Sequence, residues 1–224
     1  MLNMSFKAVI FDLDGTLLDT LQDLANSYNR VLKQMGFPTH PIDAYRYFVG
    51  DGARMCAARA LPPENRNDAT IEQCLQIFRA DYGQYWNVYT KPYDGIPEML
   101  TALSNTGLKM AILSNKPQED TERCAKEYLS QWNFEAIFGQ KTSAPKKPDP
   151  APALEISRRL NVHPKETVFI GDTSIDIKTA KAAGMFPVGV LWGFRSRDEL
   201  VKSGAKAIIE SPDELKKFIF KYTT

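Results

Sequence analysis

Two aspartates follow the first apolar stretch of the chain, and their spacing is typical of a catalytic or metal-binding pair. The short apolar run Ala8–Phe11 is followed at once by Asp12 and Asp14, and Gly15 then allows a sharp turn. Both carboxylates can face the same side at the end of a strand. Two such charges about 4 Å apart repel by about 4 kcal/mol at an effective dielectric of about 20. A hard divalent cation relieves this repulsion, and Mg²⁺ is the natural candidate.

Further polar residues suited to the same chemistry follow later apolar runs or stand beside prolines. Taken one at a time, each is a common turn residue or surface charge, and it gains meaning only beside the aspartate pair. Prolines restrict the backbone next to the lysine of this group, which holds its position. The candidates are Ser114, Asn115, Lys147, Asp172 and Asp176.

A parallel sheet would bring these residues together. Continuous apolar runs predict strands buried on both faces, at residues 8–11, 110–113, 167–170, 187–191 and 207–209. Helical patterns lie between them, at 97–105, 150–160 and 175–183. Strands that alternate with helices imply right-handed crossovers and a parallel sheet covered on both faces. Ligands bind outside the carboxyl ends of such strands, so the polar residues are expected to share one crevice.

Residues 18–91 interrupt this alternation. They contain no convincing strand, and apolar residues at helical spacing predict helices near 21–35, 52–61 and 71–85. We therefore expect two domains, an α/β catalytic core of residues 1–17 and 92–224 and a helical cap domain of residues 18–91. Because the insertion leaves the core just after Asp12–Thr16, it is expected to cover the strand ends as a lid.

Composition excludes several functional classes. The 224 residues include 28 Lys and Arg against 27 Asp and Glu, so the net charge of +1 gives no footprint for nucleic acid or an acidic membrane surface. No apolar run reaches the length of a membrane span, and the N-terminus lacks the pattern of a signal peptide. Three cysteines without CxxC spacing predict free thiols in a reducing compartment, and we expect a cytoplasmic protein.

Four motifs in order resemble those of haloacid dehalogenase (HAD) superfamily phosphohydrolases, and within that superfamily those of the phosphoglycolate phosphatases. The resemblance spans nearly the whole chain. It implies a Rossmann-like parallel sheet core (the HAD fold) with an inserted α-helical cap domain. The motifs are Asp12-Leu13-Asp14-Gly15-Thr16, Leu113-Ser114-Asn115, Lys147-Pro148-Asp149-Pro150 and Gly171-Asp172-Thr173-Ser174-Ile175-Asp176.

The resemblance also implies a role for each motif residue. Asp12 would be the nucleophile that forms an aspartyl-phosphate, and Asp14 the general acid and then the base. Mg²⁺ would bind the Asp12 carboxylate, the Asp14 backbone carbonyl and Asp172. Asp176 would ligate the metal directly, reach it through water, or hydrogen-bond Lys147, and Lys147 would neutralise the phosphoryl group.

The remaining implied contacts are to the substrate. Ser114 and Asn115 would donate to the phosphoryl group, whereas Thr16 would contact it or only brace the loop. Gly50 belongs to Val49-Gly50-Asp51-Gly52-Ala53, which resembles a cap loop of the phosphoglycolate phosphatases. The implied partner is a small phosphate ester, with 2-phosphoglycolate as the leading candidate, and the implied assembly is a monomer or homodimer.

Two other functions compete with this interpretation. A β-phosphoglucomutase-like phosphotransferase would share all four motifs and differ only in its cap. A phospho-aspartate signalling or binding module would also place an aspartate, a hydroxyl residue and a lysine around Mg²⁺. Such a module would be shorter and would lack both the helical insertion and the Asp12–Asp14 pair.

Overall fold

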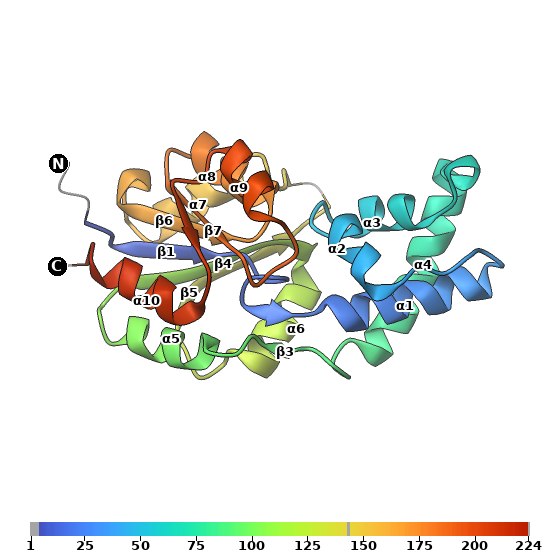
Figure 1. The fold of residues 1–224 in the computed structure, drawn as a ribbon, viewed down its shortest axis with the longest axis horizontal. Coiled ribbons are helices and arrows are strands. Elements are labelled where there is room, and N and C mark those ends of the chain that lie inside the picture. The colour runs from blue at the N-terminus through green and yellow to red at the C-terminus, as the bar shows by residue number, and fades with distance from the viewer. Residues whose placement is uncertain (1–4, 143, 224) are drawn as a thin grey trace. The chain divides into compact units, whose positions relative to one another are not determined.

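The computed structural model describes residues 5–142 and 144–223. The chain divides into two compact units, one formed by residues 1–17 and 92–224 and the other by residues 18–91. The first unit is a core of alternating strands and helices, and the second is mainly helical (Figure 1). Each unit is described by itself below.

Within the described residues, the core unit is built on a six-stranded sheet with the order β5-β4-β1-β6-β7-β8. Every pair of neighbouring strands is parallel, which confirms the α/β class expected from the sequence. The first strand lies in the middle, with Phe11 opposite Ile112 on one side and Ile170 on the other. The residues after these three positions therefore emerge at one edge of the sheet. The strands are β1 (Ala8–Phe11), β4 (Lys109–Pro117), β5 (Phe134–Gln140), β6 (Thr167–Gly171), β7 (Phe186–Val190) and β8 (Ala207–Ile209).

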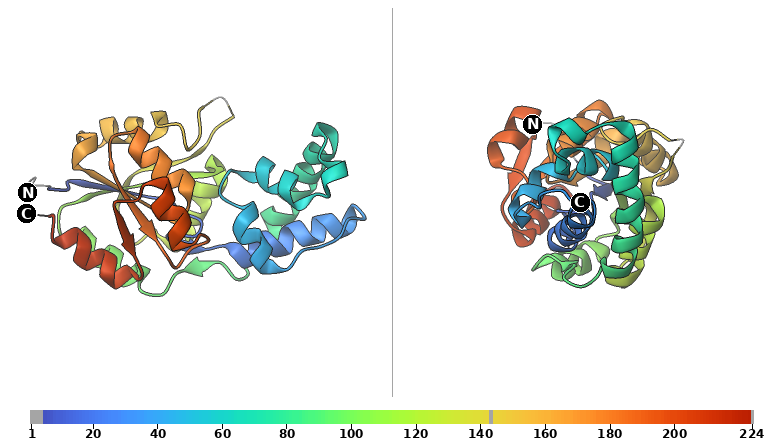
Figure 2. Two further views of the ribbon diagram at one scale, coloured as in Figure 1. Left: turned by 45° about the horizontal axis from the view of Figure 1, so that its top comes forward. Right: turned by 90° about the vertical axis from the view of Figure 1, so that its right-hand side faces the viewer.

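Helices cover both faces of this sheet, as Figures 1 and 2 show. One face carries α7 (Ala151–Arg159) and α8 (Ser174–Ala182), and a buried cluster that includes Ile10, Ile156 and Phe169 joins them to the strands. Burial on both faces explains why β1 is apolar throughout. The helices of the other face are α5 (Ile96–Ser104), α6 (Gln118–Tyr128) and α10 (Pro212–Phe220), while α9 (Arg197–Ser203) packs beside α8.

The helical unit is held together by aromatic packing between its two longest helices. Tyr28 of α1 stacks on Phe78 of α4, with ring centroids 4.0 Å apart, and Phe78 stacks in turn on Tyr82. Asp81 of α4 accepts hydrogen bonds from Arg30 of α1, which adds an ion pair to the same interface. The helices are α1 (Leu21–Gln34), α2 (Tyr45–Phe48), α3 (Ala53–Ala60) and α4 (Asp68–Tyr85).

Two short strands occur where the sequence predicted none. The first, β2 (Leu18–Asp19), and the second, β3 (Lys91–Pro92), pair as a two-stranded sheet in the segments that lead into and out of the helical unit. Two residues each are too few to leave an alternating pattern in the sequence. The interpretation of residues 18–91 as purely helical was wrong at these ends.

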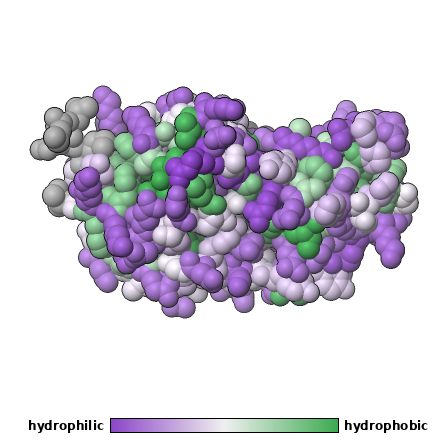
Figure 3. All heavy atoms as spheres, viewed as in Figure 1, coloured by the Kyte–Doolittle hydropathy of each residue, from purple (hydrophilic) through white to green (hydrophobic). Residues whose placement is uncertain are grey.

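Hydrophilic side chains cover much of the face of each unit drawn in Figure 3, with hydrophobic residues visible between them. Among the described helices, none combines the length and the apolar character that a membrane crossing requires.

Candidate active site

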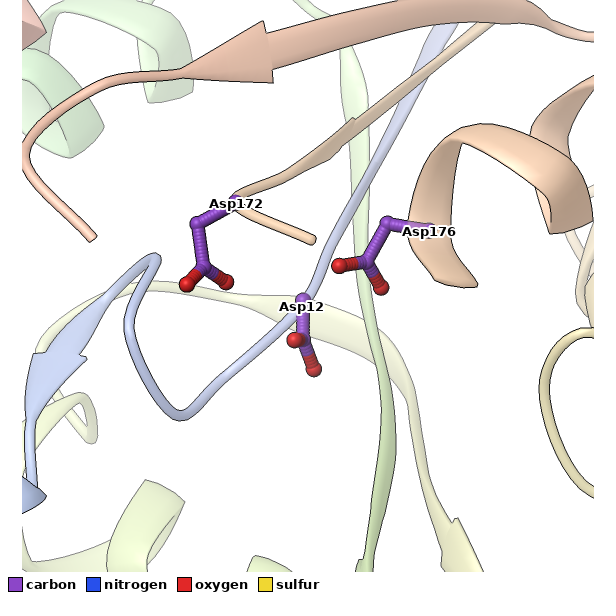
Figure 4. A group of neighbouring side chains, drawn as sticks. All are labelled: Asp12, Asp172 and Asp176. Atoms are coloured by element: carbon purple, nitrogen blue, oxygen red, sulfur yellow. The ribbon is translucent and has the colours of Figure 1, made fainter. Parts of the chain in front are cut away.

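Three aspartates from separate segments meet at the carboxyl edge of the core sheet (Figure 4). Asp12 follows β1, Asp172 follows β6, and Asp176 lies in the first turn of α8. One carboxylate oxygen from each lies within 4.8 Å of those of the other two, and all three side chains are buried. The fold thus brings these three predicted residues together, as the sequence led us to expect.

Lys147 pairs with two of these three aspartates. Its Nζ lies 2.7 Å from Oδ1 of Asp12 and 2.6 Å from Oδ1 of Asp176, and its side chain is only 2% exposed. The Lys147 backbone is fixed by Asn115, since its N–H donates to Asn115 Oδ1 and its carbonyl accepts from Asn115 Nδ2, both at 3.0 Å. Asn115 therefore positions the backbone of Lys147, and its contact with phosphate stays a prediction.

Burial and the neighbouring charges shift the pKa values of the groups in this cluster. It raises the pKa of Asp12 well above its ordinary value, and the negative charge of Asp176 adds to the effect. Burial, again with Asp176, raises the pKa of Asp172 to about 7. Burial alone would lower the pKa of Lys147, but the charges of Asp12 and Asp176 outweigh it and raise that pKa. With all three carboxylates ionised, the cluster and the Lys147 ammonium together carry a net charge of −2.

Neighbouring groups fix the outer two carboxylates. Asp172 accepts a hydrogen bond from the Thr16 hydroxyl at 3.1 Å and another from the Phe194 N–H at 2.7 Å. Asp176 accepts from the backbone N–H and the hydroxyl of Thr173 through Oδ2, so that Oδ1 faces Lys147. Thr16, for which the sequence left two roles open, is hydrogen-bonded to Asp172, and its contact with the phosphoryl group stays a prediction.

Three glycines make this close approach possible. A Cβ on Gly15 or on Gly193 would overlap Asp172, and a Cβ on Gly171 would overlap Asp176. Gly15 also has φ of +86°, a conformation that other residues rarely adopt. The glycines are part of the site because any side chain at these positions would displace a carboxylate.

Asp14 is paired with a lysine for which the sequence analysis proposed no role. Nζ of Lys116 lies 3.3 Å from one Asp14 carboxylate oxygen and 3.4 Å from the other. The backbone N–H of Lys116 donates to the Ser114 hydroxyl at 3.2 Å. Strand β4 extends to Pro117, four residues beyond the apolar run, and Ser114 and Lys116 both belong to it. The sequence analysis ended this strand with its apolar run and therefore did not place Lys116 on it.

Gly50 belongs to the helical unit, in the loop between α2 and α3, where it has φ of +119°. Arg59 braces this loop, because it pairs with Asp51 and donates to the carbonyl of Phe48 at 3.1 Å. The placement of Gly50 as a substrate contact stays a prediction.

Comparisons with known proteins agree with the fold. The haloacid dehalogenase-like hydrolase pattern matches residues 9–190. A phosphoglycolate phosphatase of Pseudomonas putida is 37% identical over 196 residues, covering 84% of this chain and 70% of the relative. One of Aquifex aeolicus is 34% identical over 188 residues, covering 84% of this chain and 86% of the relative.

The solved structures include a predicted phosphoglycolate phosphatase from Haemophilus somnus. It superposes with a TM-score of 0.88 at 27% identity, covering 95% of this chain and 97% of that one. The parallel sheet with buried aspartates at its carboxyl edge defines a phosphatase of the α/β class. The chain belongs to the haloacid dehalogenase-like hydrolase family.

Proposed function

We propose that this phosphatase is an Mg²⁺-dependent phosphomonoesterase that hydrolyses a small phosphorylated metabolite through an aspartyl-phosphate. The observation that carries the proposal is the buried carboxylate of Asp12 beside Asp172, with Lys147 at 2.7 Å. A carboxylate held next to a cation at the carboxyl end of a strand is suited to attack phosphorus.

The reaction has two steps in this proposal. An Asp12 carboxylate oxygen bonds to phosphorus while the ester P–O bond breaks, and Asp14 gives its proton to the departing alkoxide. Asp14 then accepts a proton from water as the water oxygen attacks phosphorus, which releases phosphate and restores the Asp12 carboxylate. The second aspartate thus returns to its protonated form at the end of each cycle.

The residues present fit a divalent cation. The cluster offers carboxylate oxygens, which hard cations prefer, and its charge of −2 matches one such ion. Asp12, Asp172 and the backbone carbonyl of Asp14 would hold it, while Asp176 serves mainly to orient Lys147. Bound there, Mg²⁺ would neutralise negative charge on the carboxylates and the phosphoryl oxygens.

The other core residues act on the phosphoryl group or position those that do. Lys147 would neutralise the phosphoryl oxygens, and the Ser114 hydroxyl would donate to one of them. Asn115 acts through the backbone of Lys147, and Thr16 acts through Asp172. We propose that the helical unit, including Gly50, is a cap that excludes water from the reaction.

The favoured substrate is 2-phosphoglycolate, because relatives 37% and 34% identical to this chain are phosphoglycolate phosphatases. The test compares kcat/KM for a panel of phosphorylated metabolites, measured as phosphate release in Mg²⁺ and in EDTA. We expect release that depends on the metal and is fastest for 2-phosphoglycolate. Transfer of phosphate within a sugar phosphate, without release, would instead show a β-phosphoglucomutase-like phosphotransferase.

Acid-quenched peptide mapping tests the intermediate. A peptide containing Asp12 should gain one phosphoryl group during turnover, and Asp12→Asn should abolish both the modification and the activity. Asp94→Asn provides the control, since Asp94 is an exposed residue of the same unit. Phosphate release that persists in Asp12→Asn would refute the nucleophile assignment.

A further inference from the structure

The pairing of Lys116 with Asp14 is not explained by the roles assigned above. Nζ of Lys116 lies almost equally far from the two carboxylate oxygens of Asp14, at 3.3 and 3.4 Å. The Lys116 side chain is 4% exposed and that of Asp14 is 13% exposed. Within residues 5–142 and 144–223, Lys116 is the cation that forms an ion pair with Asp14.

The protein fixes Lys116 from several directions. Its N–H donates to the Ser114 hydroxyl at 3.2 Å, and its carbonyl accepts from the Thr121 hydroxyl at 3.2 Å. Thr121 is fully buried in α6, so the helix holds the end of β4 in place. Cys124 of the same helix is also fully buried, and both charges of the pair act on its thiol. The Lys116 ammonium is therefore held by a fixed backbone and is largely shielded from solvent.

Lys116 and Lys147 contact different carboxylates of the site. Lys147 contacts Asp12 and Asp176, whereas Lys116 contacts Asp14. With Asp14 ionised, the Lys116 pair is neutral as a whole, and Asp14 is not one of the three clustered aspartates. Asp14 thus has its own cationic partner, Lys116, which is consistent with a role for Asp14 that differs from that of Asp12.

We propose that Lys116 is a positioning residue that sets the orientation of the Asp14 carboxyl group toward the leaving oxygen. This inference rests on the proposed role of Asp14 as general acid and base. A general acid must lie within hydrogen-bond reach of the atom it protonates, and a carboxyl group free to rotate meets that condition only part of the time. The symmetric contact from a buried ammonium removes that freedom.

The test uses two substrates that differ in their need for a proton. Hydrolysis of an alkyl phosphate such as 2-phosphoglycolate expels a basic alkoxide, whereas hydrolysis of p-nitrophenyl phosphate expels a stable phenolate. In Lys116→Met, we expect kcat for the alkyl phosphate to fall about 10- to 100-fold and kcat for p-nitrophenyl phosphate less than about 3-fold. KM is expected to change little for either. The matched control is Lys126→Met, an exposed lysine of α6, which should behave as wild type.

A double-mutant cycle separates action through Asp14 from independent action. If Lys116 works by positioning Asp14, then Lys116→Met combined with Asp14→Asn should be no slower than Asp14→Asn alone. Multiplied losses, or equal losses of Lys116→Met on both substrates, overturn the inference. If Asp14→Asn itself shows no preference between the two leaving groups, the proposed acid role of Asp14 fails instead.

Circular dichroism establishes whether Lys116→Met is folded. If it is not, Lys116→Arg and Lys116→Gln replace it in the test. Arginine keeps the charge and can face both carboxylate oxygens, whereas glutamine keeps a donor without the charge. The ratio of alkyl to aryl turnover should be lower in Lys116→Gln than in Lys116→Arg, and equal ratios overturn the inference.

Discussion

Replacing Asp172 by asparagine tests the electrostatics of the site without any assay of catalysis. The change removes one negative charge from the buried cluster and nearly preserves the shape of the side chain. Asparagine can still accept from the Phe194 N–H, and its NH₂ group can donate to the Thr16 hydroxyl, which rotates to accept. The main effect on the free energy of unfolding should therefore come from the charge.

The magnitude follows from the pKa of Asp172. Burial raises it from 3.8 to about 7 in the metal-free fold, and each pKa unit corresponds to about 1.4 kcal/mol. Between those two values the folded protein binds more protons than the unfolded chain, so this group lowers the free energy of unfolding as pH rises. Relative to the unfolded chain, the shifted pKa of this group costs the fold about 2 kcal/mol at pH 5, where the folded protein keeps Asp172 protonated, and about 4 kcal/mol at pH 8, where Asp172 is ionised.

Urea unfolding in EDTA measures this difference directly. Relative to wild type, Asp172→Asn should gain about 2–3 kcal/mol of stability when the pH is changed from 5 to 8. Fluorescence and circular dichroism should give the same transition, and Asp94→Asn should show no such gain. A stability difference that is constant with pH, or that favours wild type at pH 8, would refute the reasoning about buried charge.

The same two proteins test the metal site. At pH 8, Mg²⁺ should stabilise wild type by about 2.7 kcal/mol at a concentration one hundred times its Kd, because an ion that binds only the folded state adds its binding free energy. Asp172→Asn should gain far less, since it lacks one of the proposed ligands. Equal stabilisation of both proteins would place the ion elsewhere.

Three further substitutions test the roles of individual groups. Asp12→Asn should lower kcat at least about 1,000-fold and leave the protein folded, as shown by phosphate release and circular dichroism. Asn115→Ala leaves the buried N–H and carbonyl of Lys147 without their side-chain partner, so urea unfolding should show a loss of about 2 kcal/mol. Gly171→Ala places a Cβ against Asp176 and should cost about 1–3 kcal/mol and most of the Mg²⁺-induced stabilisation.

Each of these has an outcome that contradicts it. Full activity in Asp12→Asn would refute the assignment of Asp12 as the nucleophile. Unchanged stability in Asn115→Ala would show that water replaces the amide. Gly83→Ala is the control for the glycine change, because a Cβ there meets no atom within 4 Å. If Gly83→Ala and Gly171→Ala behaved alike, the close approach of Asp176 would not matter.

The elements best predicted from the sequence are those whose burial is uniform. Strands β1 and β6 are buried at every residue, and such strands appear in the sequence as unbroken apolar runs. Strand β5 at the edge of the sheet was missed because only Ala136 of its residues is fully buried. Helix α6 was also missed, since it is polar along most of its length and buries Thr121, Cys124 and Ala125.

The sequence indicated which residues form the site better than it indicated how these residues contact one another. Residue type and motif order indicated Asp12, Asp172 and Lys147, which the fold brings together. They could not indicate that Asn115 bonds the Lys147 backbone, because that contact depends on where a loop 32 residues further along the chain returns. Contacts between distant segments depend on tertiary structure, and a motif shows only which groups are available.

The lysine missed by the sequence analysis changes the charge balance of the site. Counted from the motifs alone, four carboxylates oppose one Mg²⁺ and Lys147, which leaves one negative charge in excess before any phosphate arrives. Lys116 cancels that excess through Asp14, so the remaining cluster requires two positive charges. A monovalent cation would leave a buried negative charge uncompensated, and a buried charge without a partner is strongly destabilising. In the proposed mechanism, the charge that the ion must supply therefore depends on the two lysines as much as on the aspartates.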